Sequence, residues 1–104
     1  MRAERYVKYD VNNYGAHAMC FKIGDYTFFF SYNTLIAVRV CNDLILLDHY
    51  FSRTTREHQM AVLRKCRDCN VIKVDLVRFN EIETAMEKMF SFTSDNMKEE
   101  VFRR

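Results

Sequence analysis

The sequence predicts a single α+β domain, in which a largely antiparallel sheet of five or six strands is covered on one face by two helices. Three observations lead to this prediction. Successive β-prone runs occupy residues 5–51, with only short turns between them. Two capping signatures then open two helical patterns. Finally, the length of 104 residues fits one domain, spanning 1–104, and is sufficient to bury a core.

The first half of the chain favours strands. Residues Arg5–Val11 alternate between two faces, and a turn over residues 12–15 separates them from a second strand at His17–Ile23. After Gly24-Asp25, the run Tyr26–Tyr32 (YTFFFSY) is β-prone throughout, so we expect it near the centre of the sheet.

The clearest hairpin follows. The run Leu35–Val40 is joined to Leu44–Phe51 through the turn residues Cys41–Asp43. No segment of helical length separates these β-prone runs. An antiparallel meander is therefore the expected topology, rather than βαβ units.

The periodicity then becomes helical. Thr54 and Glu57 have the spacing of a capping box, which predicts a helix over Thr55–Cys66 with Thr54 as its N-cap. At about 100° per residue, one side of this helix gathers residues suited to a core, and the neighbouring side forms a basic stripe. The first side comprises Thr55, Gln59, Val62, Leu63 and Cys66, and the stripe comprises Arg56, Met60, Arg64 and Arg67.

A sixth strand is predicted at Val71–Val77, and a second helix at Asn80–Phe90 with Asn80 as its cap. The apolar stripe expected to pack this helix on the sheet comprises Ile82, Ala85, Met86, Met89 and Phe90. Beyond it the pattern weakens, so residues 93–104 fit either a frayed tail or a short helix at Asp95–Phe102.

Composition indicates an ordinary folded protein, with 49% hydrophobic and 29% charged residues. The net charge of +2 is too small to indicate nucleic acid or an anionic membrane as the partner. The first ten residues are polar and charged, and no apolar run approaches the length of a membrane span. We therefore expect a cytoplasmic protein with no membrane partner, in which the four cysteines stay reduced.

No catalytic constellation of a specific kind is present. His49, His58 and Asp48 can be combined with Ser31 or Ser52 as a hydrolytic set, but their spacing does not support it. With only two glycines, the chain also lacks a phosphate-binding loop. We expect no enzymatic activity, no catalytic residues and no cofactor.

Cys66 and Cys69 form a C-x-x-C pair at the end of the first predicted helix. A zinc site needs two further ligands, and neither the other cysteines nor the histidines supply a second close pair. A redox pair is expected to open a helix, because the C-terminal dipole disfavours a thiolate. The expectation is therefore a structural role, with no metal site.

Basic residues provide the strongest candidates for binding. Arg53 and Arg56 accompany hydroxyl groups at a helix start, an arrangement that fits an anion or an acidic partner. The stripe of Arg56, Arg64 and Arg67 fits a phosphate backbone, with exposed aromatic residues of YTFFFSY stacking on bases. A solvated helix face explains the same arginines without any partner.

Two segments carry distinctive patterns: Phe30–Ala37 contains SYxTxIA, and Tyr50–His58 fits YxSxTTxxH. Together these segments resemble a family of small, uncharacterised proteins from bacteriophages and mobile elements. The resemblance spans roughly residues 16–60. It implies a compact α+β accessory protein that binds and inhibits or modulates a host protein, such as a defence nucleoprotein complex in the manner of an anti-CRISPR protein.

The main hypothesis is thus a non-enzymatic inhibitor in the host cytoplasm, and the alternative is a small nucleic-acid-binding module. The aromatic content of 14% also fits homodimerisation through an exposed sheet face or edge. In either case the candidate contact residues are Arg53, Arg56, Arg64, Arg67, Tyr32 and Tyr50.

Overall fold

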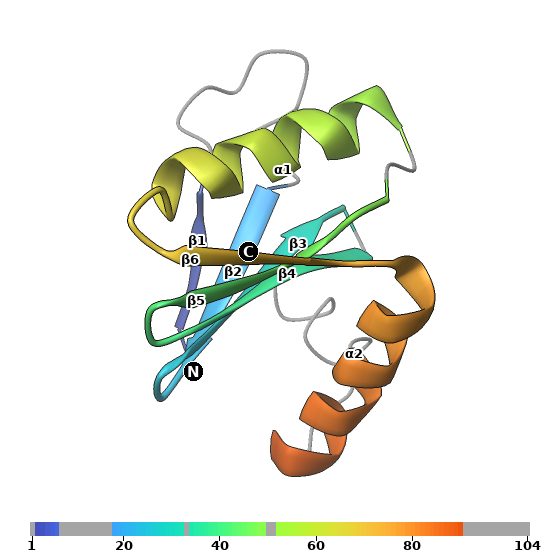
Figure 1. Cartoon of the computed structure of the whole chain (residues 1–104). Helices are drawn as coiled ribbons and strands as arrows, with labels where there is room; N and C mark the ends of the chain where they lie inside the picture. The colour runs from blue at the N-terminus through green and yellow to red at the C-terminus, as the bar shows by residue number, and fades with distance from the viewer. Residues whose placement is uncertain (1, 7–17, 33, 50–51, 91–104) are drawn as a thin grey trace.

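The fold is a six-stranded mixed sheet with one helix on each face, seen in a computed structural model that describes residues 2–6, 18–32, 34–49 and 52–90. The strands lie in the sheet in the order in which they occur in the chain, and the first five form an antiparallel meander (Figure 1). This confirms the predicted α+β class. The strands are β1 (Arg2–Arg5), β2 (Ala18–Ile23), β3 (Tyr26–Ser31), β4 (Thr34–Val40), β5 (Asp43–Leu47) and β6 (Asn70–Val74).

The last strand departs from the meander. It pairs in parallel with β5, from Asp43 opposite Asn70 to Leu47 opposite Val74. The connection between them is α1 (Arg53–Lys65), so β5, α1 and β6 form a βαβ unit at one edge of the sheet. The expectation that such units are missing therefore holds for the meander but not for this edge.

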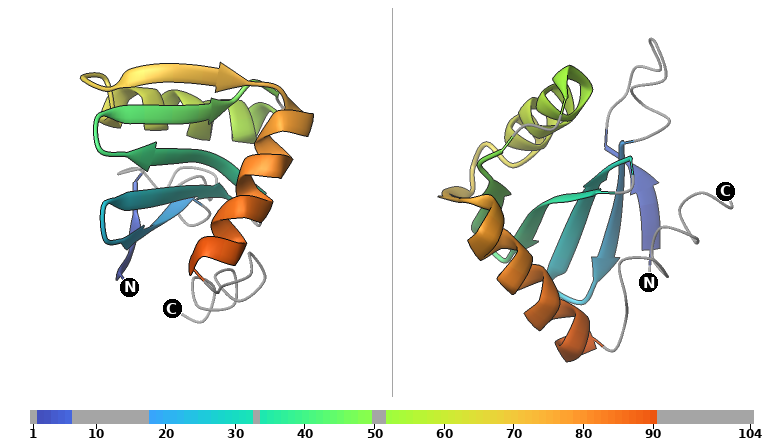
Figure 2. Two further views of the ribbon diagram at one scale, coloured as in Figure 1. Left: turned by 60° about the horizontal axis from the view of Figure 1, so that its bottom comes forward. Right: turned by 90° about the vertical axis from the view of Figure 1, so that its right-hand side faces the viewer.

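The two helices cover opposite faces, which corrects the prediction that both cover one. Figure 2 (left) shows α2 (Leu76–Phe90) in front of the sheet and α1 behind it. Each face carries its own cluster of buried residues. The α1 face includes Cys20, Phe29, Ala37, Leu44 and Val62, and the α2 face includes Phe21, Phe28, Phe30, Val38 and Phe79.

Strand sequence explains this two-sided core. Phe28, Phe29 and Phe30 are consecutive, so their side chains alternate between the faces, yet all three are buried. Strands covered on both faces carry continuous apolar runs rather than alternating ones. A β-bulge in β4 adds to the α1 face: the register with β3 shifts at Phe29/Phe30, and both Ile36 and Ala37 belong to the α1-face cluster.

The start of α1 lies earlier than predicted. Ser52, rather than Thr54, is the N-cap: its backbone is extended, and its Oγ accepts the backbone N–H of Thr55 at 3.1 Å. The predicted role of Glu57 in a capping box with Thr54 is therefore wrong. The Ser52 hydroxyl accepts the free backbone N–H of Thr55 in the first turn, so this cap needs no carboxylate.

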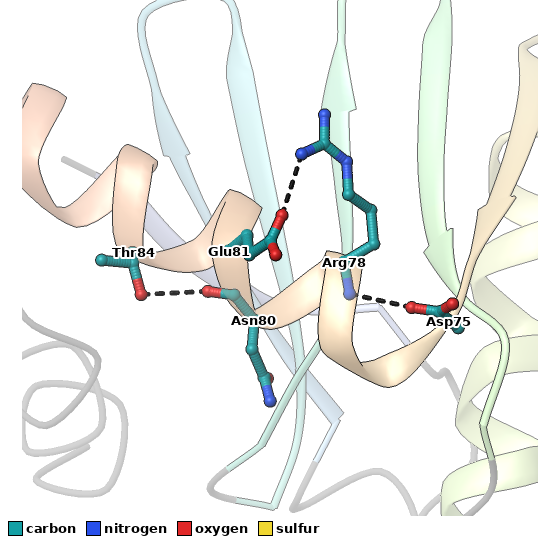
Figure 3. Close-up of polar contacts among 5 residues, drawn as sticks. All are labelled: Asp75, Arg78, Asn80, Glu81 and Thr84. Carbon is teal, nitrogen blue, oxygen red and sulfur yellow. Dashed lines mark hydrogen bonds and ion pairs between the residues drawn. The ribbon is translucent and has the colours of Figure 1, made fainter.

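The second helix also begins earlier, which shortens β6 to Asn70–Val74. Figure 3 shows the Asp75 carboxylate accepting the backbone N–H of Arg78 at 2.8 Å, while the Asn80 carbonyl accepts the Thr84 hydroxyl inside the helix. Asp75 therefore takes the capping role predicted for Asn80.

The packed stripe of α2 differs from the predicted one. Because the helix extends back to Leu76, the face that packs on the sheet carries Leu76, Phe79, Met86 and Phe90. Met89 is 57% exposed, and Ala85 is exposed as well. In a helix, residues 79, 83, 86 and 90 lie on one side. The additional first turn places Phe79 in the core, so the packed side is rotated relative to the predicted stripe.

Some predicted features lie outside the described residues: most of the strand at Arg5–Val11, the turn at 12–15 and the tail at 93–104. The first described strand is instead Arg2–Arg5. Of the helices that the structure describes, neither has the length and apolar character needed to cross a membrane.

Candidate functional site

The first helix, α1, separates a buried side from an exposed basic side, as its sequence predicts. Thr55, Gln59, Val62 and Cys66 are buried against the sheet, and Leu63 packs at the margin of the core. His58 is also buried, although the periodicity did not place it with the core residues. The exposed side carries the arginines together with Met60.

A buried polar cluster anchors the first turns of α1 to the end of β3. Ser31 Oγ lies 2.6 Å from His58 Nδ1, and the Ser31 hydroxyl lies 3.4 Å from that of Thr55. Thr55 Oγ1 is in turn 3.1 Å from Ser52 Oγ. Ser31 and His58, which belong to the hydrolytic set considered in the sequence, therefore lie in contact. Each is 1% exposed, so the contact is in the interior of the fold. Asp48 and His49 are exposed instead.

Gln59 ties the same helix to the end of β5. Its Nε2 donates to the carbonyl oxygens of Leu47, at 2.7 Å, and His49, at 3.1 Å. Its Oε1 is buried and has no hydrogen-bond partner among the described residues. The side chain therefore fixes the exit of β5, where the chain turns towards α1.

Tyr32 follows Ser31 at the β3–β4 turn. Its backbone has φ = 54°, in the left-handed region that non-glycine residues rarely adopt. The ring lies 5.9 Å from the His58 ring, and the residue is 39% exposed. This strained residue thus presents part of an aromatic ring beside the first turns of α1.

An open hollow lies beside the second half of α1. We call it the α1 hollow; it has a volume of about 350 Å³ and is lined by Met60, Leu63, Arg64 and Arg67. Met60 is 45% exposed, and the lining of the hollow is mainly apolar. Arg64 and Arg67 are both exposed, so guanidinium groups flank an apolar floor.

The predicted contact residues are not all in one place. Arg64 and Arg67 come together at the α1 hollow. Arg53 is exposed in the first turn of α1, near the end of the helix where Tyr32 contacts His58. Arg56 is exposed between these two groups, and Tyr50 lies outside the described residues.

Most aromatic residues of the YTFFFSY run lie in the core, and Tyr32 is its exposed member. Phe28, Phe29 and Phe30 are at most 2% exposed, and Tyr26 packs against Phe28 and Phe90. A sheet covered on both faces needs two layers of large side chains, so the aromatic content is used in packing.

The C-x-x-C pair is brought together at the end of α1. Cys66 is the C-cap and is buried, whereas Cys69 is half-buried. Arg39 of β4 places its Nη1 4.0 Å from Cys66 Sγ. No group of three or more metal-ligating residues occurs within the part of the chain that the structure describes.

Two features of this region have no signal in the sequence pattern. Leu63 was assigned to the buried side, but it also lines the hollow, because it stands at the boundary between the two sides of the helix. The approach of Arg39 to Cys66 depends on how β4 lies under α1, which spacing along the chain does not show.

Comparisons with known proteins place the chain in a family. Searches of curated proteins and of solved structures gave no match. A family model described as a family of unknown function, DUF8033, matches residues 1–78. The match includes the whole sheet, α1 and both segments that carry the resemblance noted in the sequence. The chain therefore belongs to the DUF8033 family, which confirms membership of an uncharacterised family.

Proposed function

We propose that this protein is a non-enzymatic binding domain that inhibits or modulates a host protein, and that the α1 hollow is its contact surface. The observation that carries the proposal is the combination of an apolar floor, Met60 and Leu63, with two flanking arginines, Arg64 and Arg67. Solvent-exposed apolar residues beside arginine are typical of the energetic centre of protein interfaces.

Charge specifies the partner further. Glu57 is the only acidic residue of α1, whereas the helix carries Arg53, Arg56, Arg64 and Lys65. An acidic protein segment with one large apolar side chain would fill the hollow and pair with the arginines, which form bidentate bonds with carboxylates. The resemblance to phage proteins supports a host protein as the owner of that segment, for example a component of a defence complex.

Nucleic acid is the alternative ligand, since the same arginines suit phosphates. Burial of the phenylalanines in β3 removes most of the stacking surface that this alternative requires. Among the described residues of the YTFFFSY run, Tyr32 alone is exposed. The apolar floor of the hollow also contributes little to binding a phosphate backbone. Both observations favour a protein partner.

The test uses the purified full chain and nuclease-treated host lysate. Size-exclusion chromatography with light scattering and mass spectrometry identifies the partner, which is then purified and titrated against the wild type and the variant Arg64→Glu/Arg67→Glu. Loss of an interface arginine typically costs about 1–3 kcal/mol, so we expect affinity to fall by tenfold or more.

Lys88→Glu is the matched control, because it makes the same kind of charge reversal at an exposed position of α2. It should leave the affinity unchanged. Equal affinity of the wild type and the double variant would reject the hollow as the contact surface. A shift that occurs in untreated lysate but is lost after nuclease treatment would instead support nucleic-acid binding. Light scattering of the protein alone tests the predicted homodimer.

A further inference from the structure

The cysteine pair at the end of α1 lies in a backbone geometry suited to a disulfide. The backbone N–H of Cys69 donates to the Cys66 carbonyl oxygen at 2.9 Å. A hydrogen bond between residues i and i+3 closes a tight turn, whose end Cα atoms are less than about 7 Å apart. Disulfide-linked residues have Cα separations of about 4.4–6.8 Å. The Cys69 thiol also raises the pKa of the Cys66 thiol, which indicates that the two side chains lie near each other.

The two thiols differ in access and in their surroundings. Cys69 is half-buried and can meet a small reagent, whereas Cys66 is fully buried. Burial raises the pKa of the Cys66 thiol, the neighbouring Cys69 adds to this, and Arg39 opposes it. The C-terminus of a helix carries a partial negative charge, which disfavours a thiolate. The Arg39 guanidinium lies 4.0 Å from Cys66 Sγ and provides a positive charge that favours it.

We propose that Cys66 and Cys69 form a reversible intramolecular disulfide, in which Cys69 reacts first and Cys66 resolves. The oxidant is a low-molecular-weight disulfide such as oxidised glutathione. The Cys69 thiolate attacks one sulfur of that disulfide, forms a mixed disulfide and expels one thiolate. The Cys66 thiolate then attacks Cys69 Sγ and expels the second. The protein loses two protons and two electrons, and the oxidant is reduced to two thiols that carry the protons.

This inference is independent of the proposed partner. It concerns the junction between α1 and β6, where Arg67 lies inside the four-residue turn that the new bond would close. The dipole at the C-terminal end of α1 disfavours a thiolate there. The Arg39 guanidinium contributed by β4 partly offsets that effect, although the pKa of the Cys66 thiol remains raised.

The experiment equilibrates the full chain in glutathione buffers of increasing oxidation, quenches with acid and alkylates the remaining thiols. Intact mass spectrometry should show a species lighter than the reduced chain by two hydrogens, with two of the four cysteines protected from alkylation. Peptide mapping should link Cys66 to Cys69. Cys66→Ser should instead accumulate a glutathione adduct at Cys69, since the resolving thiol is gone.

Cys41 provides the internal control. It is an exposed cysteine on the β4–β5 turn, and it should take up glutathione without forming the intramolecular bond. Cys41→Ser should therefore keep the Cys66–Cys69 link. The proposal is overturned if Cys41 is glutathionylated in buffers that leave Cys66 and Cys69 fully reduced. It is also overturned if the mapped disulfide includes Cys41. Both readouts use the wild-type chain, so they hold even where a serine variant fails to fold.

Discussion

At the scale of single residues, the buried polar groups determine how α1 sits on the sheet. Gln59 and Tyr6 are the clearest cases, because the buried side chain of each donates to a backbone carbonyl of a strand in the sheet. The Tyr6 hydroxyl donates to the Phe30 carbonyl oxygen at 2.8 Å, and Gln59 Nε2 donates to Leu47 and His49. Neither role is visible in the sequence, since both residues also suit an exposed position.

Gln59→Glu should destabilise the fold at neutral pH. A carboxylate there would face two carbonyl oxygens and be desolvated without a donor, at a cost of about 2–4 kcal/mol in the free energy of unfolding. Urea unfolding at pH 7 measures this loss, and it should be smaller at pH 5, where the new acid can take up a proton. Gln59→Leu serves as the matched control, because it removes the hydrogen bonds without adding charge. An equal loss for Glu at both values of pH would contradict this account.

Alkaline pH should weaken the fold through Tyr6. Burial raises the pKa of its hydroxyl far above the ordinary value near 10, and the nearby Cys20 adds to this shift. Above about pH 10 the unfolded chain releases this proton and the folded chain keeps it, so the free energy of unfolding falls as pH rises.

The slope attributable to Tyr6 is at most about 1.4 kcal/mol per pH unit. Chemical unfolding between pH 9 and 11 measures it, with Tyr6→Phe as the comparison. That variant should be less stable at pH 8 by about 1–2 kcal/mol, because the Phe30 carbonyl loses its donor. It should also show a shallower alkaline decline. Identical pH dependence in the two proteins would exclude Tyr6 as the source.

At the scale of elements, the sequence predicted the strands better than the helix ends. The strands from Ala18 to Leu47 agree with the predicted runs within a few residues, because their β-prone composition is interrupted only by short turns. Helix starts were misplaced, since Ser52, Thr54, Asp75 and Asn80 all have side chains suited to capping. The extended backbone at Ser52 identifies it as the cap of α1, and the packing of Phe79 in the core places the start of α2 before Asn80.

Ser52→Ala should therefore cost about 1 kcal/mol of stability, the usual effect of losing an N-cap. Thr54→Ala is the control, and it should have a smaller effect, because that residue lies inside the first turn of α1. Thermal unfolding of the two variants measures the difference. A larger loss at Thr54 would restore the original placement of the cap.

The β4–β5 hairpin allows a stabilising change. Val40 pairs with Asp43, so Cys41 and Asn42 form a two-residue turn, and Cys41 has φ = 55°. Asparagine tolerates this left-handed conformation better than cysteine does. Cys41→Asn should raise the free energy of unfolding by up to about 1 kcal/mol, measured by urea unfolding, whereas Val40→Asn on the adjoining strand should lower it.

At the scale of the whole molecule, the placement of the helices could not be read from their own patterns. An amphipathic stripe shows that a helix packs on a sheet, but it does not show on which face. The information lies in the strands: YTFFFSY and LIAVRV are apolar almost without interruption, as expected when both faces are covered. Of the candidate site, the arginine stripe was predictable from helical geometry. The hollow was not, because it depends on how Leu63 and Met60 stand at the margin of the core.

Phe79 should be the residue through which α2 stabilises the entire domain. It is 2% exposed and packs in the cluster that contains Phe21, Phe28 and Phe30. Phe79→Ala should reduce the free energy of unfolding by about 3–5 kcal/mol, a large part of the stability of a domain this size. Met89→Ala, at an exposed position of the same helix, should change it little. Comparable losses in the two variants would show that α2 does not cover the sheet as described.

The two-sided core also has a consequence for synthesis on the ribosome. The meander β1–β5 is made of pairings between neighbouring segments, so it can assemble as soon as it leaves the exit tunnel. At that moment both of its faces are bare. The nascent chain gains α1 first and α2 last, so the phenylalanine-rich side of the sheet stays exposed until α2 has also left the tunnel. During that interval the growing polypeptide is a natural client for chaperones that recognise aromatic surfaces.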